Sequence, residues 1–290
     1  MEFSRNIMMG DPKYFAIKKG ANPHTRNRWG LRKTVDPAKA RAQWEKMAET
    51  LADHGVNVHV IPPDPSYPGL VFPANAGVAL QVEEKIPLHQ REFILSRLTV
   101  SRGGETHIYR RFLNELEVRT HESLYSFEGE ADLNPWGDRF IFTYGPLKKQ
   151  RWAACWGIPP WKRVYGFRTS ERAGEEISHR FSPEKIMKMK LCREAFYHGD
   201  TVLCSFGPKR EYLMVYLPGI HKRDRPQLAG HPGVIPLSKS DAWAFAANSF
   251  QIIQEGGCVL FMPAGVSKEL RQQIEAKGVQ TVTVEVSEFL

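Results

Sequence analysis

A helix, a glycine and an alternating strand follow one another near both ends of this 290-residue sequence, which points to a mixed α/β fold. In the first copy, Asp36 and Pro37 are typical of a helix start, apolar residues recur at helical spacing up to Leu51, and Gly55 ends the helix. Residues 56–61 then alternate as a strand. In the second copy, a helical stripe over 266–274 precedes Gly278 and an alternating strand over 281–286.

Short strands and helices alternate along the rest of the chain. We expect strands at 77–82, 139–143, 186–191, 201–206, 211–216 and 258–262, and a helix fits 91–98 or 105–116. Units that recur at roughly 50–60 residues favour a closed ring of about five β-α-β modules in one domain over 1–290. A doubly wound open sheet is the alternative, although no Gly-x-Gly-x-x-Gly follows the first strand to indicate a dinucleotide site.

Composition argues against several classes of protein. The sequence contains no apolar run of the roughly 18 residues that a membrane span needs, and no secretory signal follows Met1, so we expect a cytoplasmic protein without a membrane partner. The four cysteines lack metal-site spacing, and Cys192, Cys204 and Cys258 are expected to be buried thiols. We therefore expect no metal and no cofactor, while a homo-oligomer stays possible. The net charge of +8 comes with basic clusters but no nucleic-acid-binding motif, so we expect no nucleic-acid partner.

Residues 146–165 stand out as an insertion rich in tryptophan, lysine and arginine. The segment is expected to lie between a strand and the next element. A surface loop held by its tryptophans is one interpretation. A lid or a partner surface is another, because aromatic residues and arginines are enriched at interfaces.

Two separate polar segments suggest a site for a guanidinium-like cation. Glu128, Glu130 and Asp132 would share one face of an extended segment, and His198 and Asp200 precede a predicted strand. Carboxylates bind the planar guanidinium through paired charge-assisted hydrogen bonds, and a histidine can transfer protons to a leaving amine. The central carbon of a guanidinium is a poor electrophile, so the reaction needs a strong nucleophile such as a thiolate. Three solvated acids and a structural histidine are the alternative.

Nearly the whole chain resembles the guanidino-group-modifying (pentein) superfamily, which includes amidinotransferases, dimethylarginine dimethylaminohydrolases and arginine dihydrolases. Segment 71–77 reads V-F-P-A-N-A-G, 127–132 reads F-E-G-E-A-D, and 197–201 reads Y-H-G-D-T. The other similar segments, in the family's order, are 12–15, 22–24, 102–105, 166–169, 247–248 and 287–290. The resemblance implies a five-bladed α/β propeller with the site at its centre.

The resemblance also implies a role for each matching residue. His198 would be the acid/base with Glu128 as its acidic partner. Asn75 and Asp200 would contact the guanidinium, with Asp132 in the same substrate-binding group. The further expected substrate contacts are Asn22, as a lid or substrate residue, and Arg102 and Arg168, as clamps for a substrate carboxylate.

Three departures from the family pattern leave two functions open. Gly69 stands where relatives often have an aspartate, Gly199 replaces a leucine and should loosen the turn that holds His198, and the family's cysteine nucleophile would follow Leu290. We expect either an arginine-directed hydrolase or amidinotransferase that works through a cysteine-bound amidino intermediate, or an inactive member that binds a ligand or a partner. The expected small-molecule ligand is an arginine-like guanidino compound, and the inactive member would bind either such a ligand or a protein partner through the 146–165 insertion.

Overall fold

The computed structural model describes residues 5–18, 22–27, 29–80, 86–155, 158–181, 183–254 and 257–290. Within these ranges the strands form five small sheets and one separate hairpin. In each three-stranded sheet, the first two strands are antiparallel and the third is parallel to the second. The repeating unit is thus a β-hairpin followed by a crossover to a parallel strand, which confirms the predicted ring of α/β modules.

The five modules follow one another along the chain. The first contains β1 (Asn6–Gly10), α1 (Pro37–Asp53) and β2 (Asn57–Ile61). The second contains β3 (Gly77–Leu80), β4 (Glu92–Leu95), α2 (Glu105–Glu115) and β5 (Arg119–Glu122). The third contains β6 (Leu133–Trp136), β7 (Arg139–Tyr144), α3 (Glu171–Phe181) and β10 (Ile186–Lys190). The fourth contains β11 (Leu203–Phe206), β12 (Tyr212–Val215), β13 (Val234–Pro236) and α4 (Lys239–Trp243). The fifth contains β14 (Phe250–Gln254), β15 (Gly257–Pro263), α5 (Lys268–Glu275) and β16 (Val279–Val284).

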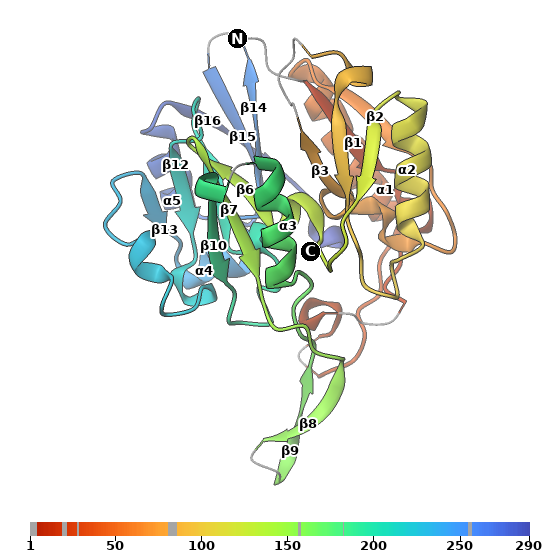
Figure 1. Ribbon diagram of the computed structural model, residues 1–290, viewed down its shortest axis with the longest axis vertical. Helices are drawn as coiled ribbons and strands as arrows, with labels where there is room; N and C mark the ends of the chain where they lie inside the picture. The colour runs from red at the N-terminus through yellow and green to blue at the C-terminus, as the bar shows by residue number, and fades with distance from the viewer. Residues whose placement is uncertain are drawn as a thin grey trace.

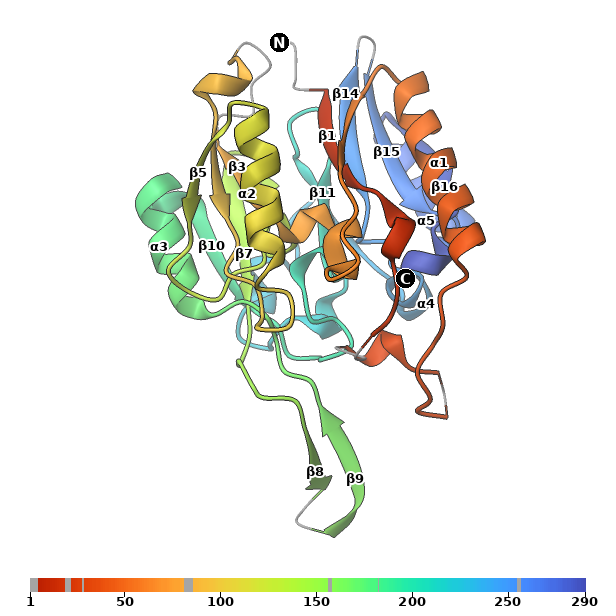
Figure 2. The same ribbon diagram turned by 90° about the vertical axis from the view of Figure 1, so that its right-hand side faces the viewer.

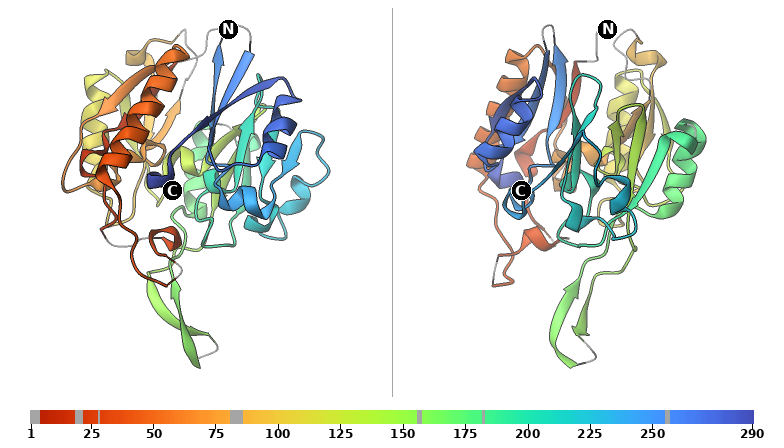
Figure 3. Two further views of the ribbon diagram at one scale, coloured as in Figure 1. Left: turned by 180° about the vertical axis from the view of Figure 1, so that it is seen from behind. Right: turned by 90° about the vertical axis from the view of Figure 1, so that its left-hand side faces the viewer.

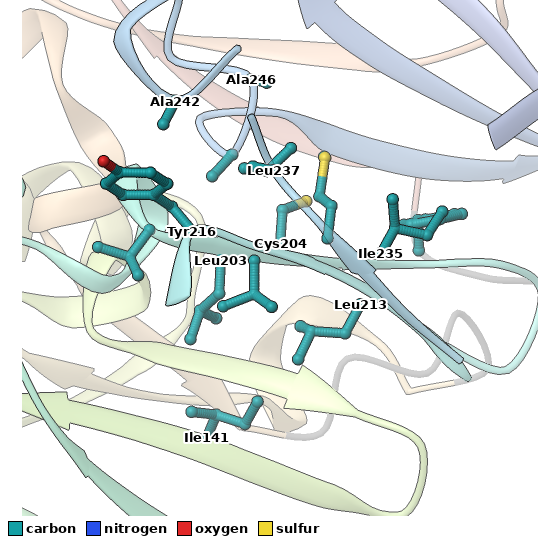
Figure 4. Close-up of a cluster of buried hydrophobic side chains, with 14 of the residues drawn as sticks. Ile141, Leu203, Cys204, Leu213, Tyr216, Ile235, Leu237, Ala242 and Ala246 are labelled. Atoms are coloured by element: carbon teal, nitrogen blue, oxygen red, sulfur yellow. The ribbon is translucent and has the colours of Figure 1, made fainter. Parts of the chain in front are cut away.

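The first and last modules pack together and close the ring. Met9 and Leu51 of the first module share one buried apolar cluster with Ile252, Val259 and Phe261 of the fifth. Figures 1 and 2 show α1, α2, α3 and α5 on the outside of the sheets, and Figure 3 shows the first and last modules from two further sides; α1 contacts β16 of the fifth module. The largest cluster joins strands of the third, fourth and fifth modules, and part of it is drawn in Figure 4.

Local sequence explains most of the helix ends. The Asp36 side chain accepts hydrogen bonds from the amides of Ala38 and Lys39 and so caps α1, as predicted. The possible helix at 91–98 is wrong, because this segment contains strand β4. Its residues Phe93, Ile94 and Leu95 are all buried, so the strand lacks the alternation that separates strands from helices in a sequence. Helices α3 and α4 were not predicted.

The 146–165 insertion forms a β-hairpin. Its strands are β8 (Arg151–Cys155) and β9 (Ile158–Val164), which pair with each other and with no other strand of the described residues. The hairpin projects from one end of the molecule in every view (Figures 1–3), and Trp152 is 62% exposed. Trp156 and the side chains of Trp161 and Lys162 lie outside the described residues. Trp152 is therefore not one of the side chains that would hold the segment against the body of the molecule.

Candidate active site

Equivalent turns of three modules supply the centre of the site. Each turn is a single 3-10 turn directly before the module's first strand: η4 (Pro73–Asn75) before β3, η6 (Gly129–Ala131) before β6, and η8 (Gly199–Thr201) before β11. Turn η6 contacts both others. Close contact requires Gly129, which has a φ of 66° and whose missing Cβ would lie 2.5 Å from the carbonyl oxygen of Gly77. The repeat of the fold thus brings distant polar residues together.

His198 lies between two carboxylates. Its Nε2 is 3.2 Å from Oε2 of Glu128, and its Nδ1 is 3.0 Å from Oδ2 of Asp132. All three residues are buried. Glu130, in contrast, is exposed. The expected common face of Glu128, Glu130 and Asp132 is wrong, because residues 129–131 form a turn and not an extended segment.

The carboxylate of Asp132 is saturated with protein donors. Oδ1 accepts hydrogen bonds from the Thr143 hydroxyl at 2.7 Å and the Gly199 amide at 2.9 Å. Oδ2 accepts one from the Thr169 hydroxyl at 2.6 Å as well as one from His198. Since a carboxylate offers about four acceptor positions, Asp132 has none left for a substrate. Its contacts fit an orienting role behind His198 and not the expected substrate contact.

Gly199 fits the turn closely. A Cβ at this position would lie 2.3 Å from Oγ1 of Thr143 and 3.0 Å from the carbonyl oxygen of Ala131. The expectation that Gly199 loosens the turn is therefore wrong: the missing side chain makes room for Thr143, and the amide of Gly199 donates to Asp132.

The two carboxylates hold His198 in its charged form. Burial alone would lower the pKa of His198, but the charge of Asp132 and hydrogen bonds to Asp132 and Glu128 outweigh burial and raise the pKa to about 10. Burial would likewise raise the pKa of Glu128. The hydrogen bond and charge of His198, together with Arg102 and Arg168, lower it to about 2. At neutral pH the pair is an imidazolium and a carboxylate, so His198 can donate a proton.

Two buried carboxylate oxygens have no hydrogen-bond partner among the described residues: Oε1 of Glu128 and Oδ1 of Asp200. Burial raises the pKa of Asp200 to about 7, although the charge of His198 and a hydrogen bond with the Asn248 side chain oppose this. Buried carboxylate oxygens without donors are costly, and a bound cation with several N–H groups would satisfy both.

Arg102 is engaged by protein groups on all three nitrogens. Its Nε and Nη2 donate to the carboxylate of Glu105, Nη1 donates to Oδ1 of Asn75 at 2.9 Å, and Nη2 donates to the carbonyl oxygen of Gly69 at 3.0 Å. Nη1 also lies 3.8 Å from Oε2 of Glu128. In this arrangement Arg102 orders Asn75 and Glu128. A substrate carboxylate would have to displace one of these partners.

Arg168 and Asn22 meet at Tyr197. The guanidinium of Arg168 lies 5.4 Å from the ring centre of Tyr197, and Nδ2 of Asn22 donates to the Tyr197 hydroxyl at 2.8 Å. His24, two residues after Asn22, contacts the carbonyl oxygen of Ala195 and packs on aromatic rings. Segment 22–25 is thereby tied to the residues that precede His198.

Two buried cysteines are poor nucleophiles. Burial raises the pKa of Cys204 to about 12 and also raises that of Cys258, so both favour the unreactive thiol. Cys192 is exposed, contrary to expectation, and its thiol contacts the carbonyl oxygens of Pro218 and Gly219. Within the described ranges, no group of His, Cys, Asp and Glu side chains is suited to a metal ion. None of the helices described there is long and apolar enough to cross a membrane.

Several residues of the site escaped the sequence-based prediction. Thr143 lies in strand β7 and Thr169 precedes α3, where nothing distinguishes them from other strand or capping threonines. The contact of Glu105 with Arg102 could be predicted, because residues three apart can pair their side chains on a helix.

Known proteins resemble this chain in sequence over part or nearly all of its length. The family model for eukaryotic N,N dimethylarginine dimethylhydrolase matches residues 11–92. The N(G),N(G)-dimethylarginine dimethylaminohydrolase of Mycobacterium tuberculosis is 26% identical over 289 residues, which cover 99% of this chain and 82% of that protein. The bifunctional arginine dihydrolase/ornithine cyclodeaminase AgrE of Nostoc is 26% identical over 264 residues, 87% of this chain but 31% of AgrE.

Solved structures show the same fold. The N-terminal domain of ArgZ bound to product, an arginine dihydrolase of cyanobacteria, matches with a TM-score of 0.79 at 22% identity, covering 100% of this chain and 93% of that chain. A dimethylarginine dimethylaminohydrolase adduct matches with a TM-score of 0.67 at 19% identity, covering 99% and 94%. The ring of modules and the sequence matches over nearly the whole chain confirm the expected fold and the expected resemblance to the guanidino-group-modifying (pentein) superfamily.

Proposed function

We propose that this protein binds arginine or a close analogue by its guanidinium group and supports hydrolysis of a C–N bond of that group. The observation that carries the proposal is the pair of buried oxygens, Oε1 of Glu128 and Oδ1 of Asp200, beside the charged ring of His198. A guanidinium offers N–H groups in a plane, which suits two carboxylates. The relatives named above, dimethylarginine dimethylaminohydrolases and arginine dihydrolases, support an arginine-like substrate.

His198 would act first as an acid. A thiolate attacks the guanidinium carbon and forms a C–S bond; the C–N bond to the leaving amine breaks as that nitrogen takes the proton of His198. Water then attacks the amidino carbon and gives one proton to His198, the C–S bond breaks, and the second proton of the water passes to solvent as the neutral product forms. Glu128 would hold the cation and the imidazolium together. An amine in place of water would make the same intermediate serve amidino transfer.

The thiolate would come from residues that follow Leu290, as the resemblance implies. The C-terminal turn η11 (Ser287–Phe289) is linked to the site by ring contacts: Phe289 stacks on Phe15 at 5.0 Å, and Phe15 contacts Phe72 at 5.6 Å. Phe72 directly precedes the turn that contains Asn75. A residue shortly after Leu290 would therefore start from a position close to the substrate-binding turns.

Ligand binding without turnover is the second candidate. It is favoured by the state of Cys204 and Cys258, which are buried and have raised pKa values. The two functions share the cation-binding step and differ only in the supply of a thiolate. Binding and chemistry can therefore be tested separately.

Calorimetry on this chain tests the binding step. We expect arginine to bind and citrulline, its uncharged analogue, to bind at least tenfold more weakly, because a charge-assisted hydrogen bond contributes about 1.5–3 kcal/mol. Glu128→Gln should weaken arginine binding by a similar factor. Equal affinity for arginine and citrulline would contradict the proposal. The chemical step is tested in a protein extended past Leu290, by release of ammonia, ornithine or citrulline from arginine, with and without an added acceptor amine. If the extended protein forms no product from any guanidine, only the binding function remains supported.

A further inference from the structure

One hydroxyl group connects the two carboxylates that flank His198. Oγ1 of Thr169 donates to Oδ2 of Asp132 at 2.6 Å and accepts from the backbone amide of Glu128 at 3.1 Å. The direction of both bonds is fixed, because the amide can only donate and the ionised carboxylate can only accept. The single hydroxyl proton of Thr169 therefore points at Asp132.

We infer that Thr169 is a positioning residue of the site: its hydroxyl holds the backbone of Glu128 and the side chain of Asp132 in the arrangement that presents both carboxylates to His198. This inference rests on the proposed function for its relevance to catalysis, but the arrangement itself can be tested without a substrate. No substrate contact is assigned to Thr169.

Because the site is buried, no solvent molecule can take over the role of the Thr169 hydroxyl. Asp132 is 1% exposed, so water cannot replace a lost donor without a rearrangement. Removal of the Thr169 hydroxyl would leave Oδ2 of Asp132 with His198 alone and would also leave the amide of Glu128 without its partner. One substitution would thus loosen both Glu128 and Asp132, although these two carboxylates contact different ring nitrogens of His198.

A second pair supports the other oxygen of Asp132. Thr143 and the amide of Gly199 both donate to Oδ1, and the missing Cβ of Gly199 leaves the space that Oγ1 of Thr143 occupies. Gly199→Ala should therefore push Thr143 away and reproduce part of the effect of Thr143→Val. The two substitutions change different chain segments that both contact Asp132. A comparison of their effects therefore distinguishes loss of the Thr143 hydroxyl from a general disturbance of η8.

The test measures the protonation state of His198 in the ligand-free protein. The readout is the ¹⁵N chemical shift of each ring nitrogen, recorded as the pH is raised. Thr169→Val keeps the shape of the side chain and removes the hydroxyl; Thr169→Ser keeps the hydroxyl. Thr106→Val is the matched control, since Thr106 is also buried but its hydroxyl bonds the carbonyl oxygen of Ser96. A thermal melt of each variant checks that it is folded.

We expect Thr169→Val to lower the midpoint for His198 by about one pH unit, because Asp132 and Glu128 move away from the ring nitrogens and lose part of the attraction that raises the pKa of His198. Thr169→Ser should restore the original midpoint, and Thr106→Val should not change it. A wild-type midpoint in Thr169→Val, or a lowered one in Thr169→Ser, would overturn the inference. If Thr169→Val does not fold, the same shift is expected for Thr143→Val and Gly199→Ala, and its absence in both would overturn it. Failure of the wild type to bind arginine would count against the proposed function and not against this result.

Discussion

Acidification from pH 8 to pH 6 should weaken arginine binding close to tenfold, because Asp200 gains a proton in this range. With a pKa of about 7 in the ligand-free site, the ionised fraction of Asp200 falls from about 0.9 to about 0.1. A guanidinium stays positive at both pH values and prefers the ionised form, so affinity rises with pH. His198 and Glu128, with pKa values of about 10 and about 2, keep their charges throughout.

Calorimetry at pH 6, 7 and 8 and constant ionic strength measures this dependence. Asp200→Asn is the control, because it keeps the size of the side chain and cannot ionise: its arginine affinity should be weaker than that of the wild type at pH 8 and nearly flat across the series. A wild-type affinity that does not change with pH would refute the reasoning. So would a pH slope that survives in Asp200→Asn.

The same substitution should change stability in the opposite direction from binding. Folded Asp200 keeps its proton up to about pH 7, whereas the unfolded chain releases it near pH 4. The unfolded state therefore binds fewer protons between these values, and the stability of the ligand-free protein falls as pH rises through them. Asp200→Asn removes this loss, so at pH 8 it should melt at a higher temperature than the wild type. A lower Tm at pH 8 would contradict the buried position of the charge.

Three other substitutions test separate parts of the structure. Arg168→Gln should weaken arginine binding about tenfold and leave agmatine, which has no carboxylate, unaffected; equal losses for both ligands would argue against a carboxylate clamp. Glu105→Ala should lower the free energy of unfolding in urea by about 3 kcal/mol or more, because Arg102 loses its buried partner. Trp152→Ser in the projecting hairpin should change the free energy of unfolding by less than about 0.5 kcal/mol, and a larger loss would show that the hairpin packs on the body.

The elements that could be predicted from the sequence are those with local signals. Helix α1 has a capping aspartate, a proline in its first turn and a glycine at its end, and these act within a few residues. Strand β4 has no such signal, since its burial comes from neighbours on both faces of its sheet. The hairpin of β8 and β9 likewise depends on pairing and not on a hydrophobic pattern, so the 146–165 segment could be recognised as an insertion but not as strands.

The site could be predicted by residue type but not by role. Glu128, Asp132 and His198 were expected together, and the structure places them in contact. Which acid is free to meet a ligand depends on the donors around Asp132: Thr143 on the next strand, and Thr169 and Gly199 from segments further along the chain. Such a distinction is a property of the assembled turns. The three-residue spacing of Arg102 and Glu105 is enough to predict their ion pair, and the sequence-based prediction did not include it.

The position of the site on turns from separate modules has a consequence for unfolding. A ligand held by Asn75, Glu128 and Asp200 would touch the second, third and fourth modules at once, so opening of any one of them would release it. Bound arginine should therefore slow amide hydrogen exchange in strands β3, β6 and β11 together, including backbone far from any ligand atom. The ligand would link three modules at the centre of the ring, so these modules would unfold more cooperatively in the bound protein than in the free protein.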